Sequence, residues 1–179
     1  MAQIKKKKFF DVEIPLINKE TQAQAYELKE LEGRFIKYDL TRMLKGKGVE
    51  ANFKIKVEND KAIAYPCRLS VMPYFLKRIM RKGTNYVEDS FSVNCKDAQL
   101  RVKPFLITRR KVSRAVRKVL REMAKEELIR YVKNKNVEKL FEEIIKNQLQ
   151  KPLSLTLKKI YPLSLCEIRV LKVEKEIEK

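Results

Sequence analysis

The stretch from residue 108 to residue 121 constrains the fold of this chain more than any other part of the sequence. Between Arg109 and Arg121 there are seven Lys or Arg residues and no Asp or Glu. At about 100° per residue, a helix gathers the apolar residues into one sector and the cations into the opposite one. The apolar sector comprises Val112, Val116, Val119, Leu120 and Met123, and the basic sector Arg110, Arg114, Arg117, Lys118 and Arg121. The pattern predicts a helix over residues 109–123 that packs on a core and presents cations to a polyanion.

The composition is typical of a folded chain with an anionic partner. The 179 residues are 44% hydrophobic and 36% charged, and the net charge is +19. Such an excess of positive charge repels itself unless an anion compensates it, and phosphate is the partner this charge favours. An anionic membrane is the alternative polyanion. The chain, however, has no run of about 18 apolar residues, and the basic helix lacks the Trp, Phe and Leu side of a membrane-surface helix.

The residue types argue against catalysis. The chain has no histidine, so the usual general base and metal ligand are missing. It has four glycines and no glycine-rich phosphate-binding loop. A Mg²⁺-dependent enzyme would need Asp39, Asp60 or the pair Glu88 and Asp89 to converge on one site, and their spacing does not indicate this. We therefore predict no catalytic residue, no metal site and no cofactor.

The N-terminus and the cysteines indicate in which cellular compartment the protein is expected. The lysine run at residues 5–8 precedes two phenylalanines, as in a signal peptide, but Asp11 and Glu13 interrupt the apolar run at once. Export is therefore not expected, and residues 1–8 are interpreted as a basic tail. The three cysteines are far apart and show no C-x-x-C spacing. They are expected to be free thiols in a reducing compartment.

Residues 9–107 are predicted to be mostly β. Apolar and polar residues alternate over 10–14 and indicate a first strand. Residues 18–32 mix helix formers and sheet formers, and the sequence does not decide between them. A further strand after residue 32 places three apolar residues on one side: Ile36, Tyr38 and Leu40.

A β-hairpin is predicted around Asn59 and Asp60, which have the chemistry of a tight turn. The strand before the turn has inward residues at alternate positions, namely Ala51, Phe53, Ile55 and Val57. The return strand is expected to bury Ile63, Tyr65, Cys67 and Leu69.

A short helix is predicted over residues 73–83, with Pro73 in its first turn and Gly83 past its end. A second hairpin is expected to pair residues 86–95 with residues 99–107. On its return strand two cations, Arg101 and Lys103, point away from the apolar side and lead into the basic helix. The sequence therefore predicts one positive patch from Arg101 to Arg121.

Residues 108–163 are predicted to be mostly helical. A helix of mixed charge follows Asn136, a good N-cap, with apolar residues at i, i+3 and i+4. Residues 164–173 alternate and indicate a closing strand, and residues 174–179 form a polar tail. No internal repeat or linker is visible, so residues 1–179 are interpreted as a single domain of α+β class.

Three local strings, taken in order, resemble a known family. The first is Asp-Val-Glu-Ile-Pro at residues 11–15, followed by Gly-Arg-Phe at 33–35. The second is Leu-Arg-Val-Lys-Pro at 100–104, which leads into the basic helix. The third and most specific is Lys-Ile-Tyr-Pro-Leu at 159–163 with Glu-Ile-Arg at 167–169. Together the strings are similar to the archaeal and eukaryotic small-subunit ribosomal protein family S3Ae, also named eS1.

The resemblance implies an antiparallel, barrel-like β core with flanking helices. It also implies a place on the platform of the small ribosomal subunit in the cytoplasm, near the mRNA exit. The implied partners are ribosomal RNA and neighbouring platform proteins, with mRNA nearby, and no cofactor or catalytic residue is implied. Two departures stand out: residues 65–73 replace a Gly-His-Asp-Leu-Thr-Arg-Asp-like stretch of the family, and the basic N-terminal extension is reduced to residues 5–8.

The charge pattern and the resemblance together predict RNA contacts through phosphate neutralisation by clustered Arg and Lys. The predicted contacts are Lys5, Lys6, Lys7, Lys8, Lys77, Arg78, Arg81, Lys82, Arg101, Lys103, Arg109, Arg110, Lys111, Arg114, Arg117, Lys118 and Arg121. Five aromatic residues are either core residues or platforms on which bases stack: Tyr38, Phe53, Tyr65, Phe91 and Phe105. The alternative function is a free-standing basic RNA- or DNA-binding protein that is not integral to the ribosome.

Overall fold

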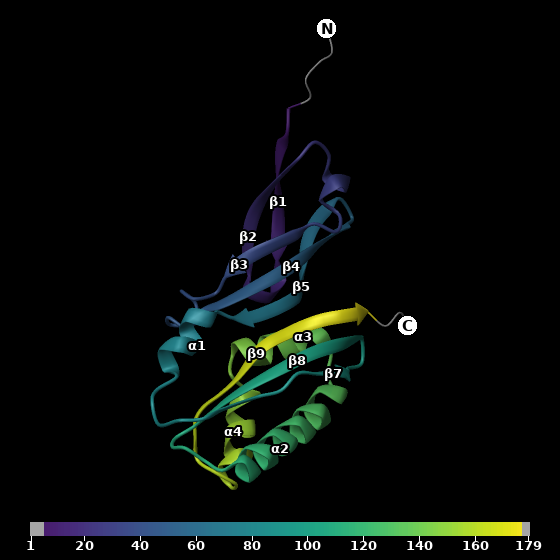
Figure 1. Ribbon diagram of the computed structural model, residues 1–179. Coiled ribbons are helices and arrows are strands. Elements are labelled where there is room, and N and C mark those ends of the chain that lie inside the picture. The colour runs from purple at the N-terminus through teal and green to yellow at the C-terminus, as the bar shows by residue number, and fades with distance from the viewer. Residues whose placement is uncertain (1–5, 177–179) are drawn as a thin grey trace.

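The computed structural model describes residues 6–176 and shows a mixed α+β protein (Figure 1). The N-terminal elements are β1 (Lys8–Ile14), η1 (Pro15–Ile17), β2 (Lys19–Ala25), η2 (Leu28–Leu31), β3 (Phe35–Asp39), β4 (Val49–Glu58) and β5 (Lys61–Val71). The middle elements are α1 (Pro73–Ile79), β6 (Tyr86–Glu88), β7 (Phe91–Asn94) and β8 (Ala98–Thr108). The last elements are α2 (Arg114–Lys133), α3 (Val137–Ile145), α4 (Gln150–Lys158) and β9 (Leu163–Glu176). The segment that the sequence left undecided forms β2 and the 3-10 turn η2.

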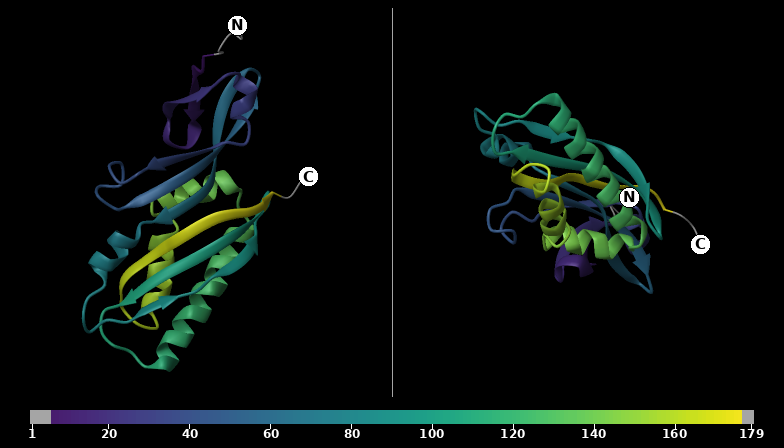
Figure 2. Two further views of the ribbon diagram at one scale, coloured as in Figure 1. Left: turned by 45° about the horizontal axis from the view of Figure 1, so that its top comes forward. Right: turned by 90° about the horizontal axis from the view of Figure 1, so that it is seen from below.

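The strands of the described chain form one sheet of nine strands, and β5 joins its two parts. One side of β5 pairs with β4, to which β3 adds. The other side is divided, because its start pairs with β1 in parallel and its end pairs with β9 antiparallel. Beyond β9 lies β8, whose far side is shared by β6 and β7. The molecule therefore has an N-terminal part, β1–β5, and a C-terminal part that contains β6–β9 and the long helices (Figures 1 and 2).

The sheet is open, so the barrel-like closure expected for the β core is not confirmed. Its edge strands β2 and β3 nevertheless approach each other through side chains. Lys19 Nζ donates to the Tyr38 hydroxyl at 3.0 Å, and Arg34 Nη1 donates to the Gln24 carbonyl at 2.9 Å. No backbone ladder joins β2 to β3 within residues 6–176. The N-terminal part is thus a curved sheet whose edges are bridged by side chains.

The first hairpin forms where the sequence predicts it. Asn59 and Asp60 have φ angles of 48° and 58°, as a type I′ turn requires to match the twist of the strands. The strand before the turn buries Ala51, Phe53 and Ile55 as expected.

The return strand, β5, corrects the prediction. Phe53 pairs with Pro66 whereas Asn52 pairs with Arg68, so Cys67 is an extra residue that forms a β-bulge. The bulge moves the buried set from even to odd positions: Ala62, Ala64 and Pro66 before it, and Leu69 and Val71 after it. The prediction that Ile63, Tyr65 and Cys67 face the core is therefore wrong, and the prediction for Leu69 is right.

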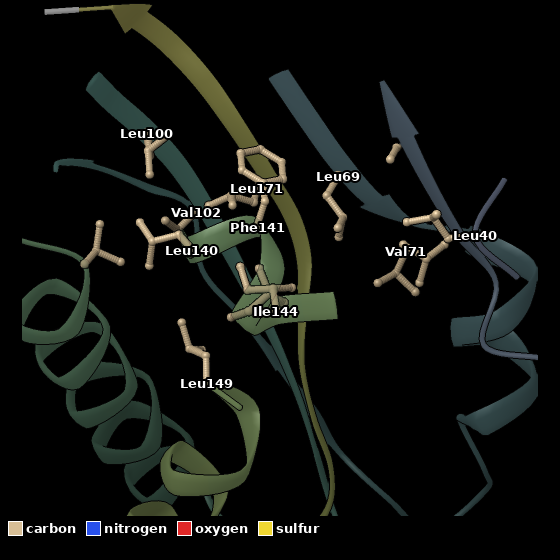
Figure 3. Packing of buried hydrophobic residues seen from close by; sticks show 14 of the residues in the cluster. Leu40, Leu69, Val71, Leu100, Val102, Leu140, Phe141, Ile144, Leu149 and Leu171 are labelled. Atoms are coloured by element: carbon tan, nitrogen blue, oxygen red, sulfur yellow. The ribbon is translucent and has the colours of Figure 1, made fainter. Parts of the chain in front are cut away.

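A row of buried side chains crosses the sheet and connects its two parts. Successive register partners from β7 to β4 are Phe91, Val102, Leu171, Leu69 and Ala51. None is more than 8% exposed. Helix α3 contacts β5 and adds Phe141 and Ile144 to the same cluster (Figure 3). The N-terminal and C-terminal parts therefore share one hydrophobic core, which supports the surface described below.

The short helix and the second hairpin form as predicted, with small differences. Helix α1 buries Leu76, whereas Met80 lies past its end and is exposed. Strands β6 and β7 both pair with β8, and residues 89–90 between them belong to neither strand. The three cysteines are free thiols, as expected.

Helix α2 corrects the prediction for the basic stretch in two ways. It begins at Arg114, because the Ser113 hydroxyl accepts from Val116 N at 3.4 Å as an N-cap, so residues 109–111 precede the helix. Its buried line also differs from the predicted one and consists of Leu120, Ala124, Leu128 and Val132. The helix packs on β6, β7 and α4 along this i+4 line, which leaves Val119 43% exposed.

Candidate nucleic-acid interface

The linker between β8 and α2 is held in place by Asn85. The side-chain oxygen of Asn85 accepts from Val112 N at 2.9 Å. Thr108 N donates to the Asn85 carbonyl at 2.9 Å, and Asn85 N donates to Thr108 Oγ1 at 3.1 Å. Thr108 is fully buried, so its two bonds to Asn85 are partly shielded from water. They fix the basic linker beside the segment that follows α1.

A third segment reaches the same place. Arg109 N donates to the Pro162 carbonyl at 3.3 Å, and Thr108 pairs with Leu163. Figures 1 and 2 show that α2 begins and α4 ends at this extremity, the lower end in Figure 1. We call the exposed cations of these three segments the basic end: Arg81, Lys82, Arg109, Arg110, Lys111, Arg114, Lys158 and Lys159.

The positive charge of the basic end has no internal compensation. In the part of the chain that the structure describes, none of its side chains takes part in an ion pair or a hydrogen bond. The cause lies in the sequence, because the three segments come from stretches without any Asp or Glu, at residues 61–87, 98–121 and 144–166. The fold brings parts of three acid-free stretches together, so their positive potentials add. This favours the binding of a polyanion.

The first turn of α2 adds to this potential. It contains no acidic residue, and Arg114 and Arg117 are found there instead. A helix N-terminus carries partial positive charge, so cations in the first turn disfavour the free helix by a few tenths of a kcal/mol. The same unpaired N–H groups and guanidinium groups favour a bound anion. The local sequence is therefore better suited to a phosphate-bound helix than to a free one.

The predicted cations of the N-terminal run lie elsewhere. Lys6, Lys7 and Lys8 are exposed at the start of β1, at the opposite end of the molecule from the start of α2 (Figure 1). Lys7 Nζ lies 5.7 Å from the ring centre of Tyr26. Lys5 lies outside the described residues. The structure therefore does not bring this run together with the basic end.

Arg101 has a partner within the chain. Its Nε donates to Glu174 Oε1 at 2.7 Å, and the Ser92 hydroxyl donates to the other oxygen of Glu174 at 2.7 Å. The bond from Ser92 and the guanidinium of Arg101 lower the pKa of the Glu174 carboxyl. The carboxylate stays charged and neutralises Arg101. Lys103, two residues on, is half-buried.

The remaining predicted cations lie on two helices. On α1, Lys77 and Arg78 are exposed, and the Arg78 guanidinium lies 5.4 Å from the ring centre of Phe75. On α2, Arg121 is exposed and Lys118 Nζ lies 3.8 Å from a carboxylate oxygen of Glu122.

Arg117 differs from the other cations of α2. It is half-buried, and its Nε atom is buried without a hydrogen-bond partner among the described residues. Its place at the border of the buried side of α2 follows from the buried line of this helix, which differs from the predicted one.

The predicted aromatic platforms are mostly core residues. Phe53, Phe91 and Phe105 are buried, whereas Tyr38 and Tyr65 are half-buried. The exposed aromatic residues are others, which sequence reasoning did not select: Phe9, Tyr26, Phe35, Tyr74 and Tyr86. Sequence reasoning also missed Lys158 and Lys159, although the absence of acids over residues 144–166 is a signal that singles them out.

The carboxylates considered for metal binding contact different partners instead of one shared site. Asp39 accepts from Thr41 N at 2.8 Å, and Glu88 pairs with Arg169 at 2.8 Å. Within residues 6–176 no group of three or more His, Cys, Asp or Glu is placed to hold a metal ion. None of the helices described is both long enough and apolar enough to cross a membrane.

A continuous β framework that holds a cluster of Arg and Lys without acidic partners is suited to contact with a polyanion. Comparison with known proteins identifies the family. The model of the Ribosomal S3Ae family matches residues 1–176, and the chain belongs to that family. Its members are ribosomal proteins, so the chain is a structural component and not an enzyme.

Relatives in archaea agree with this assignment. The small ribosomal subunit protein eS1 of Nanoarchaeum equitans is 27% identical over 169 residues, which cover 90% of this chain and 85% of the relative. The protein of the same name in Pyrobaculum arsenaticum is 28% identical over 157 residues, with coverages of 87% and 70%. The one in Saccharolobus islandicus is 26% identical over 186 residues, with coverages of 98% and 89%. The family resemblance found in the three sequence strings is thereby confirmed.

Proposed function

We propose that this chain is an integral protein of the small ribosomal subunit and that it binds ribosomal RNA through the basic end. The observation that carries the proposal is the meeting of three acid-free segments at one extremity, with exposed cations that have no partner within the described chain. The family, and relatives named small ribosomal subunit protein eS1, support the ribosomal setting.

The mechanism is phosphate neutralisation on a rigid support. Guanidinium groups such as those of Arg110 and Arg114 bind phosphate through two parallel hydrogen bonds. Since Asn85 and Thr108 fix the linker that carries Arg110, its backbone loses little conformational freedom on binding. RNA is then selected by shape and 2′-hydroxyl contacts rather than by a groove code.

The family resemblance further supports a place on the platform near the mRNA exit. In that setting the partners are ribosomal RNA, neighbouring platform proteins and nearby mRNA, and the compartment is the cytoplasm, where ribosomes work. The predicted contacts outside the basic end, at Lys6–Lys8 and on α1, would then bind other segments of RNA.

Sedimentation of a cell extract tests whether the chain is integral to the subunit. Fractions of a sucrose gradient are analysed by mass spectrometry before and after a high-salt wash. We expect stoichiometric recovery in the small subunit after the wash. Recovery at the top of the gradient would contradict the proposal and favour a free-standing nucleic-acid-binding protein.

Charge reversal tests the surface. The double variant Arg110→Glu and Arg114→Glu is compared with Lys29→Glu and Lys37→Glu, two exposed cations of the N-terminal part. RNA affinity is measured across a salt series, where each phosphate contact contributes about 0.7 to 0.9 to the slope of log affinity against log salt. We expect the first variant to lose affinity and slope, and the second to retain both. Equal behaviour of the two variants would show that charge alone, and not the basic end, determines binding.

A further inference from the structure

Tyr86 is an exposed aromatic residue whose ring is supported by a buried aromatic ring. The side chain is 57% exposed. Its ring stacks on that of Phe105, with the centroids 5.9 Å apart and the planes 16° apart. Phe105 is only 1% exposed, so Tyr86 covers it with one side of its ring. Tyr86 therefore lies against a core side chain while more than half of it remains exposed.

The position of Tyr86 places this ring beside the basic end. Tyr86 directly follows Asn85, the residue that holds the basic linker. It pairs with Ile107, two residues before Arg109. Arg81 and Lys82 precede it on the segment that leaves α1. A base on this ring would thus have cations on two neighbouring segments for the phosphates on either side of it.

We infer that Tyr86 is a stacking platform for an unpaired nucleobase of the bound RNA, with the cations of the basic end taking its flanking phosphates. The inference rests on the proposed function and deepens it, because it names the RNA as partly single-stranded. Aromatic stacking accepts any base, since each has a π-face. The support by Phe105 fixes the ring before binding, which lowers the entropy lost when a base stacks.

The test uses the full chain and two labelled RNAs with equal numbers of nucleotides, an oligoadenylate and a hairpin closed by a non-nucleotide linker, which has no unpaired base. Affinities are measured for wild type, Tyr86→Phe, Tyr86→Leu and Phe35→Ala. Leucine keeps an apolar cover on Phe105 but has no π-face. Phe35 is another exposed aromatic residue, on β3 in the N-terminal part, and serves as the matched control.

We expect Tyr86→Leu to weaken binding of the single strand by about five- to a hundredfold, the range for one lost base–aromatic stack. The salt slope should remain unchanged, because no phosphate contact is removed. Tyr86→Phe, Phe35→Ala and hairpin binding by all variants should stay near wild type. Thermal unfolding of each variant verifies that the fold is intact.

The outcomes separate this inference from the proposed function. If Tyr86→Leu binds the single strand like wild type while Arg110→Glu and Arg114→Glu lose affinity, the stacking platform is wrong and the basic end stands. If Tyr86→Leu weakens the single strand and the hairpin equally, Tyr86 acts through the fold and the inference fails as well. If the charge reversals have no effect, the proposed function itself fails.

Discussion

The N-terminal and C-terminal parts of the molecule share one sheet but differ in how they carry charge. Residues 1–71 contain fifteen Lys and Arg against ten Asp and Glu, whereas residues 72–179 contain twenty-seven against thirteen. In the N-terminal part carboxylates lie close to cations, as Glu30 does to Arg34 at 3.8 Å and Glu13 to Lys61 at 3.9 Å. In the C-terminal part the acids pair with cations on the sheet, along α2 and on α3, and within the described residues none pairs with a cation of the basic end. The comparison shows that distribution of charge, rather than its total, defines the candidate interface.

The largest expected effect tests whether the two parts fold as one unit. Leu171 of β9 pairs with Leu69 of β5 and with Val102 of β8, so Leu171→Ala leaves a cavity at the junction. We expect a loss of about 2–5 kcal/mol in the free energy of unfolding, measured by urea titration with circular dichroism and tyrosine fluorescence. Both probes should report a single transition at a lower urea concentration.

The control is Leu155→Ala, because Leu155 lies on α4 and is largely exposed. Its effect should stay within about 0.5 kcal/mol. Two separate transitions in the Leu171 variant would show that the N-terminal and C-terminal parts unfold independently, and the shared core would then not unite them.

A smaller effect is expected for the ion pair that joins the two parts. Lys47, between β3 and β4, reaches Glu167 of β9 at 2.7 Å, and their side chains are 13% and 12% exposed. Glu167 also accepts from Gln150 at 3.3 Å. Glu167→Gln leaves Lys47 without its charged partner in a poorly hydrated site, so we expect a loss of about 1.5–3 kcal/mol in thermal or urea unfolding.

A matched control for this pair is Glu142→Gln. Glu142 pairs with Lys146 at 3.2 Å, but both side chains are about half exposed. Exposed pairs on a helix contribute about 0.3–0.5 kcal/mol, so the control should change stability much less. Equal losses of stability in the two variants would mean that the ion pair between the N-terminal and C-terminal parts stabilises the fold no more than an exposed ion pair on a helix does.

The pair of Arg101 and Glu174 gives a prediction that depends on pH. The hydrogen bond from Ser92 and the nearby Arg101 lower the pKa of Glu174 in the folded state. Its contribution to stability is therefore present above the pKa of the unfolded chain and is lost as the pH falls through the lowered value. Wild type should be more stable than Glu174→Gln at neutral pH, and the difference should shrink as the pH falls through the lowered pKa of Glu174. Melting temperatures across a pH series measure it, and a difference independent of pH would contradict the assignment.

The smallest effect on stability is expected for Arg117. Because its Nε is buried without a partner, replacement by methionine keeps the apolar stem and removes an unsatisfied donor. We expect Arg117→Met to change the free energy of unfolding by less than about 1 kcal/mol. A loss above about 2 kcal/mol would show that Arg117 has a strong polar contact. Arg114→Met, at an exposed position of the same helix, should instead lower RNA affinity at unchanged stability.

Several features could be predicted because they depend on neighbouring residues alone. The turn at Asn59 and Asp60 forms because both residues tolerate positive φ, and strand β1 forms because its apolar residues alternate. The α+β class and the free thiols follow in the same way from periodicity and spacing. The family could be predicted because short strings keep their order along the chain.

The errors of prediction have equally local causes. The extra residue at Cys67 reverses the inward side of β5, and alternation by itself cannot locate a bulge. The sequence pattern starts α2 too early because the cations before Ser113 have good helix propensity, whereas the bonds of Asn85 and Thr108 hold them in a non-helical linker.

By itself, the sequence determined that this protein is basic, that its cations occur in long stretches without acids, and that its strands and helices follow one another as they do. Periodicity and charge depend on the order of residues along the chain, so they do not depend on the tertiary structure. The tertiary structure alone decided that the segments around residues 81–85, 108–114 and 158–163 meet at one end, that Glu174 pairs with Arg101, and that the ring of Tyr86 stacks on the buried Phe105. These contacts join residues far apart in the chain, and only the packing of the whole sheet and its helices brings them together.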